Sequence, residues 1–149
     1  KGAVEQIGRK LKEISSAPGY DSQLFFERVV ISFILGNGDA HLKNYSISYR
    51  GKDNIRLAPA YDIVCSKLVL PDEEDSAITI NGKKNGLKIE DFNKLAEYLN
   101  IPAKIRYNNF INKYNTIKEI IGSSSLSDSK KQRFLKIVED RLRRLGLPK

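Results

Sequence analysis

Two polar loops contain the residues best suited to chemistry. The first, residues 36–44, contains Asp39 and Asn44 five positions apart, and the second, residues 58–62, ends in Asp62. A carboxylate beside an acceptor hydroxyl can orient that hydroxyl and take its proton. Carboxylate and amide oxygens are hard ligands of the kind that Mg²⁺ accepts together with nucleotide phosphates. The three side chains therefore indicate a phosphate-transfer site.

A β-hairpin between the two loops is expected to bring them together. Large side chains alternate with serine over residues 45–49, as is typical of a strand. Residues 50–54 are predicted to form a turn, and residues 55–58 a second strand. Because the chain folds back at this turn, we expect Asp62 to lie beside the first loop. An Asp-x-x-x-x-Asn loop, two strands and an Asp form the layout of the phosphotransfer centre in protein-kinase-like enzymes.

Helices are expected on both sides of this segment. Apolar residues recur at helical spacing over residues 4–14, and a second helix is predicted from Asp21 or Ser22 to Leu35. Apolar residues surround the second helix almost completely, which is typical of a helix buried in the middle of a domain. The whole chain, residues 1–149, is predicted to be one mostly α domain with a small β-hairpin. The other elements expected are a short strand at residues 77–80 and helices over residues 92–99, 102–122 and 127–145.

The composition is that of a globular protein with an excess of positive charge. Of 149 residues, 40% are hydrophobic and 30% are charged, with a net charge of +8. Residues 128–149 hold eight Lys or Arg and three acids, which indicates a solvated helix face or, alternatively, a surface for nucleic acid or an acidic partner. Residues 71–75 are expected to form a solvated acidic loop. No apolar run is long enough to span a membrane, and the single cysteine, Cys65, excludes an intrachain disulfide.

The two polar loops together resemble a known family. Residues 38–46 (GDAHLKNYS), followed by residues 57–62 (LAPAYD), resemble the C-terminal lobe of HipA-type serine/threonine kinases, the toxins of bacterial toxin–antitoxin pairs. Residues 78–83 and 90–92 are also similar to that family. The resemblance implies the C-terminal, helical lobe of a protein-kinase-like fold and a cytoplasmic enzyme that transfers phosphate from ATP, with Mg²⁺, to a protein. It also implies a DNA-binding antitoxin of HipB type as partner, and the family's substrates include aminoacyl-tRNA synthetases.

The resemblance assigns a role to each polar side chain. Asp39 would be the catalytic base, and Asn44 and Asp62 would bind Mg²⁺. His41 or Lys43 would contact the transferred phosphate. Without the family, the same residues are also compatible with ordinary loop positions. Asp39, Asn44 and Asp62 would then be caps or turn residues, His41 would hydrogen-bond its own loop, and Lys43 would be a solvated lysine.

A kinase also needs parts that this sequence lacks. It contains no G-x-G-x-x-G loop, no P-loop motif and no upstream strand with a phosphate-binding lysine. The chain starts at Lys1 and contains no methionine. We therefore expect a piece of a longer protein whose nucleotide-binding lobe, the main ATP site, lies before Lys1. We expect this chain alone to be inactive.

Other phosphotransferases leave alternatives open. Aminoglycoside and choline kinases have similar loops with a histidine just before the glycine, where this chain has Asn37. Phosphoinositide kinases share the Gly-Asp-x-His-x-x-Asn pattern of residues 38–44, but we expect Asp-Phe-Gly or a close relative there in place of residues 60–62. The alternatives are a small-molecule or lipid phosphotransferase lobe and a non-catalytic module that binds through its basic last helix.

Overall fold

The computed structural model describes residues 2–149 as five α-helices, four short 3₁₀ turns and one two-stranded antiparallel hairpin. The mostly α fold with a small hairpin, predicted from the sequence, is therefore confirmed. Within residues 2–149, no helix combines the length and the apolar character needed to cross a membrane. The helices and strands in chain order are α1 (Val4–Ile14), α2 (Pro18–Ile34), β1 (Ile47–Tyr49), β2 (Ile55–Leu57), α3 (Ile89–Tyr98), α4 (Tyr114–Ser123) and α5 (Asp128–Arg144).

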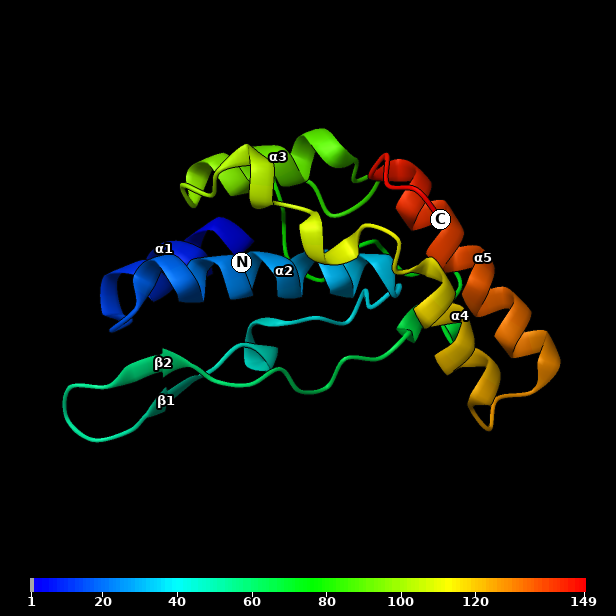
Figure 1. Ribbon diagram of the computed structural model, residues 1–149, viewed down its shortest axis with the longest axis horizontal. Helices are drawn as coiled ribbons and strands as arrows, with labels where there is room; N and C mark the ends of the chain where they lie inside the picture. The colour runs from blue at the N-terminus through cyan, green and yellow to red at the C-terminus, as the bar shows by residue number, and fades with distance from the viewer. Residues whose placement is uncertain (1) are drawn as a thin grey trace.

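Helix α2 runs through the middle of the molecule, as its apolar composition predicts. In Figure 1, α1 and α3 lie on one side of it, the hairpin lies on the other side, and α5 crosses its C-terminal end. Phe25, Phe26 and Phe33 of α2 are buried in a core that includes residues of all five helices. Burial of each such side chain contributes about 1.5–3 kcal/mol to folding. The helix begins at Pro18, earlier than predicted. Proline has no N–H, but the N–H groups of the first helical turn have no partner within the helix, so proline costs nothing there.

A buried carboxylate attaches the hairpin to the start of α2. Asp21 is fully buried and accepts hydrogen bonds from the Leu57 N–H and from Arg56 Nη2, both at 2.9 Å. Burial by itself raises the pKa of Asp21, but these bonds outweigh it and hold the pKa below its ordinary value. The strands predicted at residues 45–49 and 55–58 are confirmed, each one or two residues shorter.

Two other predicted elements are wrong. Residues 77–80 form isolated bridges in place of a strand. The helix expected over residues 102–122 is two 3₁₀ turns, Ala103–Ile105 and Asn108–Phe110, followed by α4. Asn112 has a φ of 58°, a left-handed conformation that interrupts helical structure and that asparagine adopts more readily than most residues.

Helix α5 follows the signals predicted for it. It begins directly after Ser127, where the predicted helix starts, and ends two residues before Gly146, whose φ is 63°. Glycine takes this conformation without the steric cost that a Cβ atom adds. Val138 and Leu142 are buried, as their spacing predicts.

Candidate functional site

The first polar loop leaves α2 along a path that its glycines fix. Gly36 has a φ of 70°, which turns the chain away from the helix. At Gly38, a Cβ atom would lie 2.4 Å from the carbonyl oxygen of Glu74, so a larger residue here would displace the neighbouring loop. Close packing at Gly38 therefore sets the position of Asp39, the next residue.

A chain of polar contacts connects four of the predicted site residues. His41 Nε2 lies 2.8 Å from Asp39 Oδ1, and the His41 N–H donates to Asn44 Oδ1 at 2.8 Å. Asn44 Nδ2 in turn donates to Asp62 Oδ2 at 2.9 Å. The last bond joins the two polar loops, so the hairpin brings Asp62 beside the first loop as expected.

Asp62 is held in an uncommon backbone conformation. Its φ of 55° lies in the left-handed region that few residues other than glycine enter. Asn37 Nδ2 donates to its carbonyl at 3.5 Å, and Asn44 donates to its carboxylate. The Tyr61 hydroxyl donates to the Lys43 carbonyl at 2.5 Å, a further bond between the loops. Strained backbone that surrounding contacts hold in place is concentrated at functional sites.

The side chains that would meet a substrate are open to solvent. The Asp39 and His41 side chains are 61% and 59% exposed, respectively, and Lys43 is also exposed. Because the His41 ring faces Asp39 in this structure, a contact of His41 with phosphate would require the ring to turn. Lys43 lies on the 3₁₀ turn Leu42–Asn44. A protein substrate could therefore reach this loop from solvent.

The pair formed by Asn44 and Asp62 fits Mg²⁺ better than a metal held by protein ligands alone. Among residues 2–149, no group of three or more His, Cys, Asp and Glu side chains is placed to hold a metal. Mg²⁺ needs only one or two protein oxygens when nucleotide phosphates and water complete its shell. The Asn44 amide would have to turn, because its Oδ1 accepts the His41 N–H in this structure.

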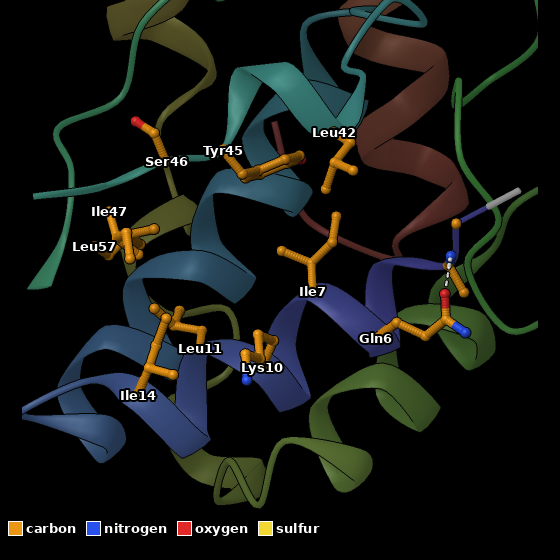
Figure 2. Close-up of a pocket in the computed structure, with 12 residues that line it drawn as sticks. Gln6, Ile7, Lys10, Leu11, Ile14, Leu42, Tyr45, Ser46, Ile47 and Leu57 are labelled. Carbon is orange, nitrogen blue, oxygen red and sulfur yellow. Dashed lines mark hydrogen bonds between the residues drawn. The ribbon is translucent and has the colours of Figure 1, made fainter. Parts of the chain in front are cut away.

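An apolar groove borders the same loop. It has a volume of about 510 Å³ and lies between α1 and the hairpin. Figure 2 shows Ile7 of α1 pointing toward Leu42 and Tyr45, which lie on either side of Lys43 and Asn44 along the chain. The groove gives the loop an apolar flank on which an aliphatic or aromatic group can pack.

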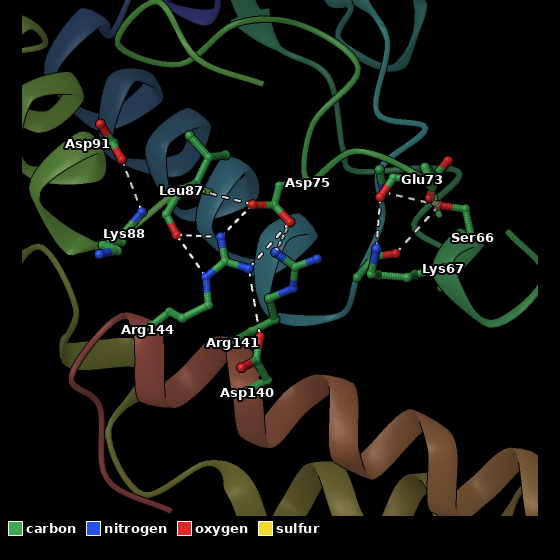
Figure 3. Close-up of polar contacts among 12 residues, drawn as sticks. Ser66, Lys67, Glu73, Asp75, Leu87, Lys88, Asp91, Asp140, Arg141 and Arg144 are labelled. Atoms are coloured by element: carbon green, nitrogen blue, oxygen red, sulfur yellow. Dashed lines mark hydrogen bonds and ion pairs between the residues drawn. The ribbon is translucent and has the colours of Figure 1, made fainter. Parts of the chain in front are cut away.

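The segment that follows Asp62 supports the first loop (Figure 3). The Gly38 N–H donates to Ser66 Oγ at 3.0 Å, and Ser66 Oγ donates to Glu73 Oε2 at 2.6 Å. Lys67 Nζ donates to the Glu73 carbonyl at 2.7 Å. These bonds fix the backbone beside Asp39 from a part of the chain that is distant in sequence.

Asp75, at the end of this segment, lies in a buried charged cluster. This corrects the predictions of a solvated acidic loop and of a solvated basic helix face. Its carboxylate pairs with Arg141 and Arg144 of α5 and accepts the Leu87 N–H at 3.0 Å (Figure 3). The two guanidinium groups lie over the Phe33 ring, 4.6 and 4.9 Å from its centre. The acidic loop is therefore not wholly solvated, and α5 is not simply a solvated basic face. Charges that are far apart in sequence meet here, in the Asp75 cluster.

Several residues that hold the site were missed by the sequence analysis. Asn37 and Tyr61 lie inside the two polar loops, so their closeness to the predicted site residues is a usable signal. Ser66 and Asp75 carry no such signal, because their partners Gly38 and Arg141 are 28 and 66 residues away.

Comparisons with known proteins point to one family. A family model described as the HipA-like C-terminal domain matches residues 1–138. The chain is 38% identical over 85 residues, 56% of its length, to "Putative kinase Y4dM" of Sinorhizobium fredii. It is 33% identical over 62 residues, 42% of its length, to a "Putative kinase" of Haemophilus influenzae. The matched segments cover only 20% and 18% of those relatives, so the chain matches a small part of each.

A solved structure has the same fold. HipA from the Shewanella oneidensis complex of HipA, HipB and operator DNA matches this chain with a TM-score of 0.78 at 18% sequence identity. The match covers 98% of this chain and 36% of that one. Because the family model spans nearly the whole sequence, the chain belongs to the HipA-like C-terminal domain family, which confirms the resemblance that its two polar loops indicate.

Proposed function

We propose that this chain is the lobe that carries the catalytic loop of an ATP-dependent serine/threonine protein kinase. The observation that carries the proposal is the 2.9 Å bond between Asn44 and Asp62, which joins two potential metal ligands beside the exposed Asp39. Kinases use a base and two Mg²⁺ ligands in this chain order. Membership of the HipA-like family and its kinase-named relatives support the same class of reaction.

Asp39 would act on the acceptor hydroxyl. Its carboxylate would accept a hydrogen bond from the serine or threonine hydroxyl, orient it toward the γ-phosphate of ATP and take its proton as the new O–P bond forms and the bond from the γ-phosphorus to the departing ADP breaks. His41 Nε2, 2.8 Å away, orients the carboxylate until a substrate arrives. We also assign to His41 and Lys43 the contact with the transferred phosphate, where donor groups offset its negative charge.

Asn44 and Asp62 would hold Mg²⁺, which supplies charge compensation to the ATP phosphates. The left-handed conformation of Asp62 and the bond from Asn37 keep the Asp62 carboxylate directed at Asn44. The backbone conformation of Asp62 therefore orients that ligand, and the 3₁₀ turn Leu42–Asn44 positions Asn44.

The remaining parts of the proposal concern a longer protein. We place the main ATP site in an upstream lobe and the enzyme in the cytoplasm, acting on a protein substrate. Aminoacyl-tRNA synthetases are the substrate class that the family suggests. A DNA-binding antitoxin of HipB type is the proposed partner, and the Shewanella complex, which contains HipB and operator DNA, supports it.

Phosphate transfer from labelled ATP tests the proposal in that longer protein. We expect D39N and D62N to lower kcat at least about 100-fold. The control D72N, which changes an exposed acid outside the site, should leave kcat unchanged. The isolated chain of 149 residues should transfer no phosphate. A wild-type rate in D39N would refute its role as base, and preferred transfer to an aminoglycoside or a phosphoinositide would favour the alternative phosphotransferases.

The structure weakens the alternative of a basic binding module on the last helix. Arg141 and Arg144 are engaged with Asp75. Arg143 is 76% exposed, but it pairs with Asp140. A nucleic-acid surface on this part of α5 would therefore have to break the buried pairs with Asp75 and compete with Asp140 for Arg143.

A further inference from the structure

A small cavity lies behind the Asn44–Asp62 pair. Its volume is about 10 Å³ for the centre of a water-sized sphere, which is the room that one water molecule needs. Side chains of α2 and of both polar loops line it, among them Arg28, Asn37, Asn44 and Asp62. The cavity therefore lies between the core helix and the two residues proposed to bind Mg²⁺.

Two buried polar atoms of residues that line this cavity have no hydrogen-bond partner among residues 2–149. One is a donor, Arg28 Nη1, and the other is an acceptor, Asn37 Oδ1. The Asn37 residue is only 3% exposed, so bulk water does not reach it freely. Native structures pair nearly all such groups, often through a buried water, because an unpaired one destabilises the fold.

The chemistry of the two atoms selects the ligand. Water can accept a hydrogen bond from the Arg28 guanidinium and donate one to the Asn37 amide oxygen. A cation would match Asn37 but would be repelled by Arg28, and an anion would match Arg28 but not Asn37. The space is about that of one water molecule. One water therefore satisfies the size of the cavity and both unpaired atoms.

The other polar atoms of the same two side chains already hold the loop that ends in Asp62. Arg28 Nη2 donates to the Ala58 carbonyl at 2.7 Å, where this loop begins. Asn37 Nδ2 donates to the Asp62 carbonyl at 3.5 Å, where it ends. A water between Arg28 and Asn37 would connect these two bonds. The orientation of a metal ligand depends on such supporting contacts.

We propose that Arg28 and Asn37, bridged by one ordered water, are positioning residues that fix Asp62 for binding of Mg²⁺. The water site follows from the cavity and its two unpaired atoms. Its effect on the metal rests on the proposed function, in which Asn44 and Asp62 are the ligands.

A high-resolution crystal structure of the chain tests the water. Density is expected within about 3.2 Å of both Arg28 Nη1 and Asn37 Oδ1, the limit of an N–H···O hydrogen bond. A cavity without density at that position overturns the water bridge. This measurement needs neither activity nor metal, so it is decisive even if the kinase assignment fails.

Mn²⁺ titration of the longer protein with ATP present, followed by NMR line broadening at Asn44 and Asp62, tests the positioning role, because nucleotide phosphates complete the metal shell. R28M is expected to weaken Mn²⁺ binding about 10-fold or more, and R28K, which keeps the charge but offers one donor group, to weaken it less. The matched control R50M changes an exposed arginine in the hairpin turn and should bind as wild type. If R28M loses its helical circular dichroism, R28K is compared with R50M instead, and equal affinities in that comparison overturn the role.

The two measurements separate this inference from the proposed function. Water density without Mn²⁺ broadening at Asn44 and Asp62 in the wild type refutes the proposed metal ligands and the positioning role, and the water site stands. Broadening in the wild type that R28M and R28K leave unchanged supports the ligands and overturns the positioning role.

Discussion

Replacing Asp75 with asparagine tests what holds the segment after Asp62. D75N keeps the shape of the side chain but removes its charge. Arg141 is 3% exposed, so its guanidinium would remain buried without a carboxylate partner. Arg144, 18% exposed, would lose the same partner. The amide oxygen can still accept from both arginines, but the NH₂ group then faces the Leu87 N–H and Arg144 Nη2, so the loss of charge is accompanied by the loss of these two acceptor contacts.

The expected loss in the free energy of unfolding is about 3–5 kcal/mol, the cost of breaking a buried ion pair on one side. Domains of this size have a total of about 5–15 kcal/mol, so D75N should remove a large share of it. The matched control is D140N. Asp140 is 44% exposed and pairs with Arg143 and Arg144 at the surface, so D140N should cost about 0–1 kcal/mol.

Urea unfolding followed by circular dichroism at neutral pH measures both variants. Urea is preferred to guanidinium because a salt would screen the surface pairs of the control. A loss in D75N no larger than that in D140N would refute the reasoning, since it would mean that the Asp75 cluster contributes no more than a surface pair.

Acid dependence gives an independent check on the same carboxylate. Burial by itself raises the pKa of Asp75, but hydrogen bonds from Arg144 and Arg141 outweigh it and lower the pKa below its ordinary 3.8. A lowered pKa means that the unfolded chain binds the proton first, so the contribution is complete above about 3.8 and is lost as the pH falls further. The wild type should therefore lose more stability than D75N on acidification below that value, and parallel losses would contradict the assignment.

Two further changes probe the first loop and its flank. Gly38→Ala should cost about 1–3 kcal/mol in urea unfolding, because the new Cβ meets the Glu74 carbonyl. Gly19→Ala, which meets no atom within 4 Å, is the control, and an equal cost in both would contradict this reason. Burial raises the pKa of Tyr45 to about 12, so in an alkaline absorbance titration Tyr45 should ionise only near that pH. Y45F should reduce the late step, and an undiminished late step would show that Tyr45 ionises early.

The sequence predicts well those elements whose determining contacts are local. Helices α1 and α5 follow apolar spacing and the residues at their ends. The segment after Pro102 is different, because its apolar residues are spaced as in a helix although Asn112 has a left-handed conformation. The start of α2 was missed because Pro18 reads equally as the end of one helix and as the first residue of the next.

In the candidate site too, contacts between residues close in sequence were predicted and contacts between distant residues were not. Asn44 and Asp62 are 18 residues apart and joined by a hairpin, so their contact follows from local topology. The partners of Asp75 are 66 and 69 residues away. Charge alone does not determine which of many arginines an acid meets. The acidic loop was therefore assigned to solvent, and the basic helix to solvent or to a nucleic-acid or acidic partner.

Both ends of residues 62–75 depend on α2, the helix most enclosed by the core. At the Asp62 end, Arg28 of α2 holds the preceding loop through a 2.7 Å bond. At the Asp75 end, the two arginines that pair with the carboxylate lie over the ring of Phe33 of α2. Between these ends, Ser66 accepts the Gly38 N–H and, with Lys67, donates to Glu73. Because both ends are fixed by a helix that cannot move without disrupting the core, and the middle is bonded to the first loop, the orientation of Asp62 depends on α2.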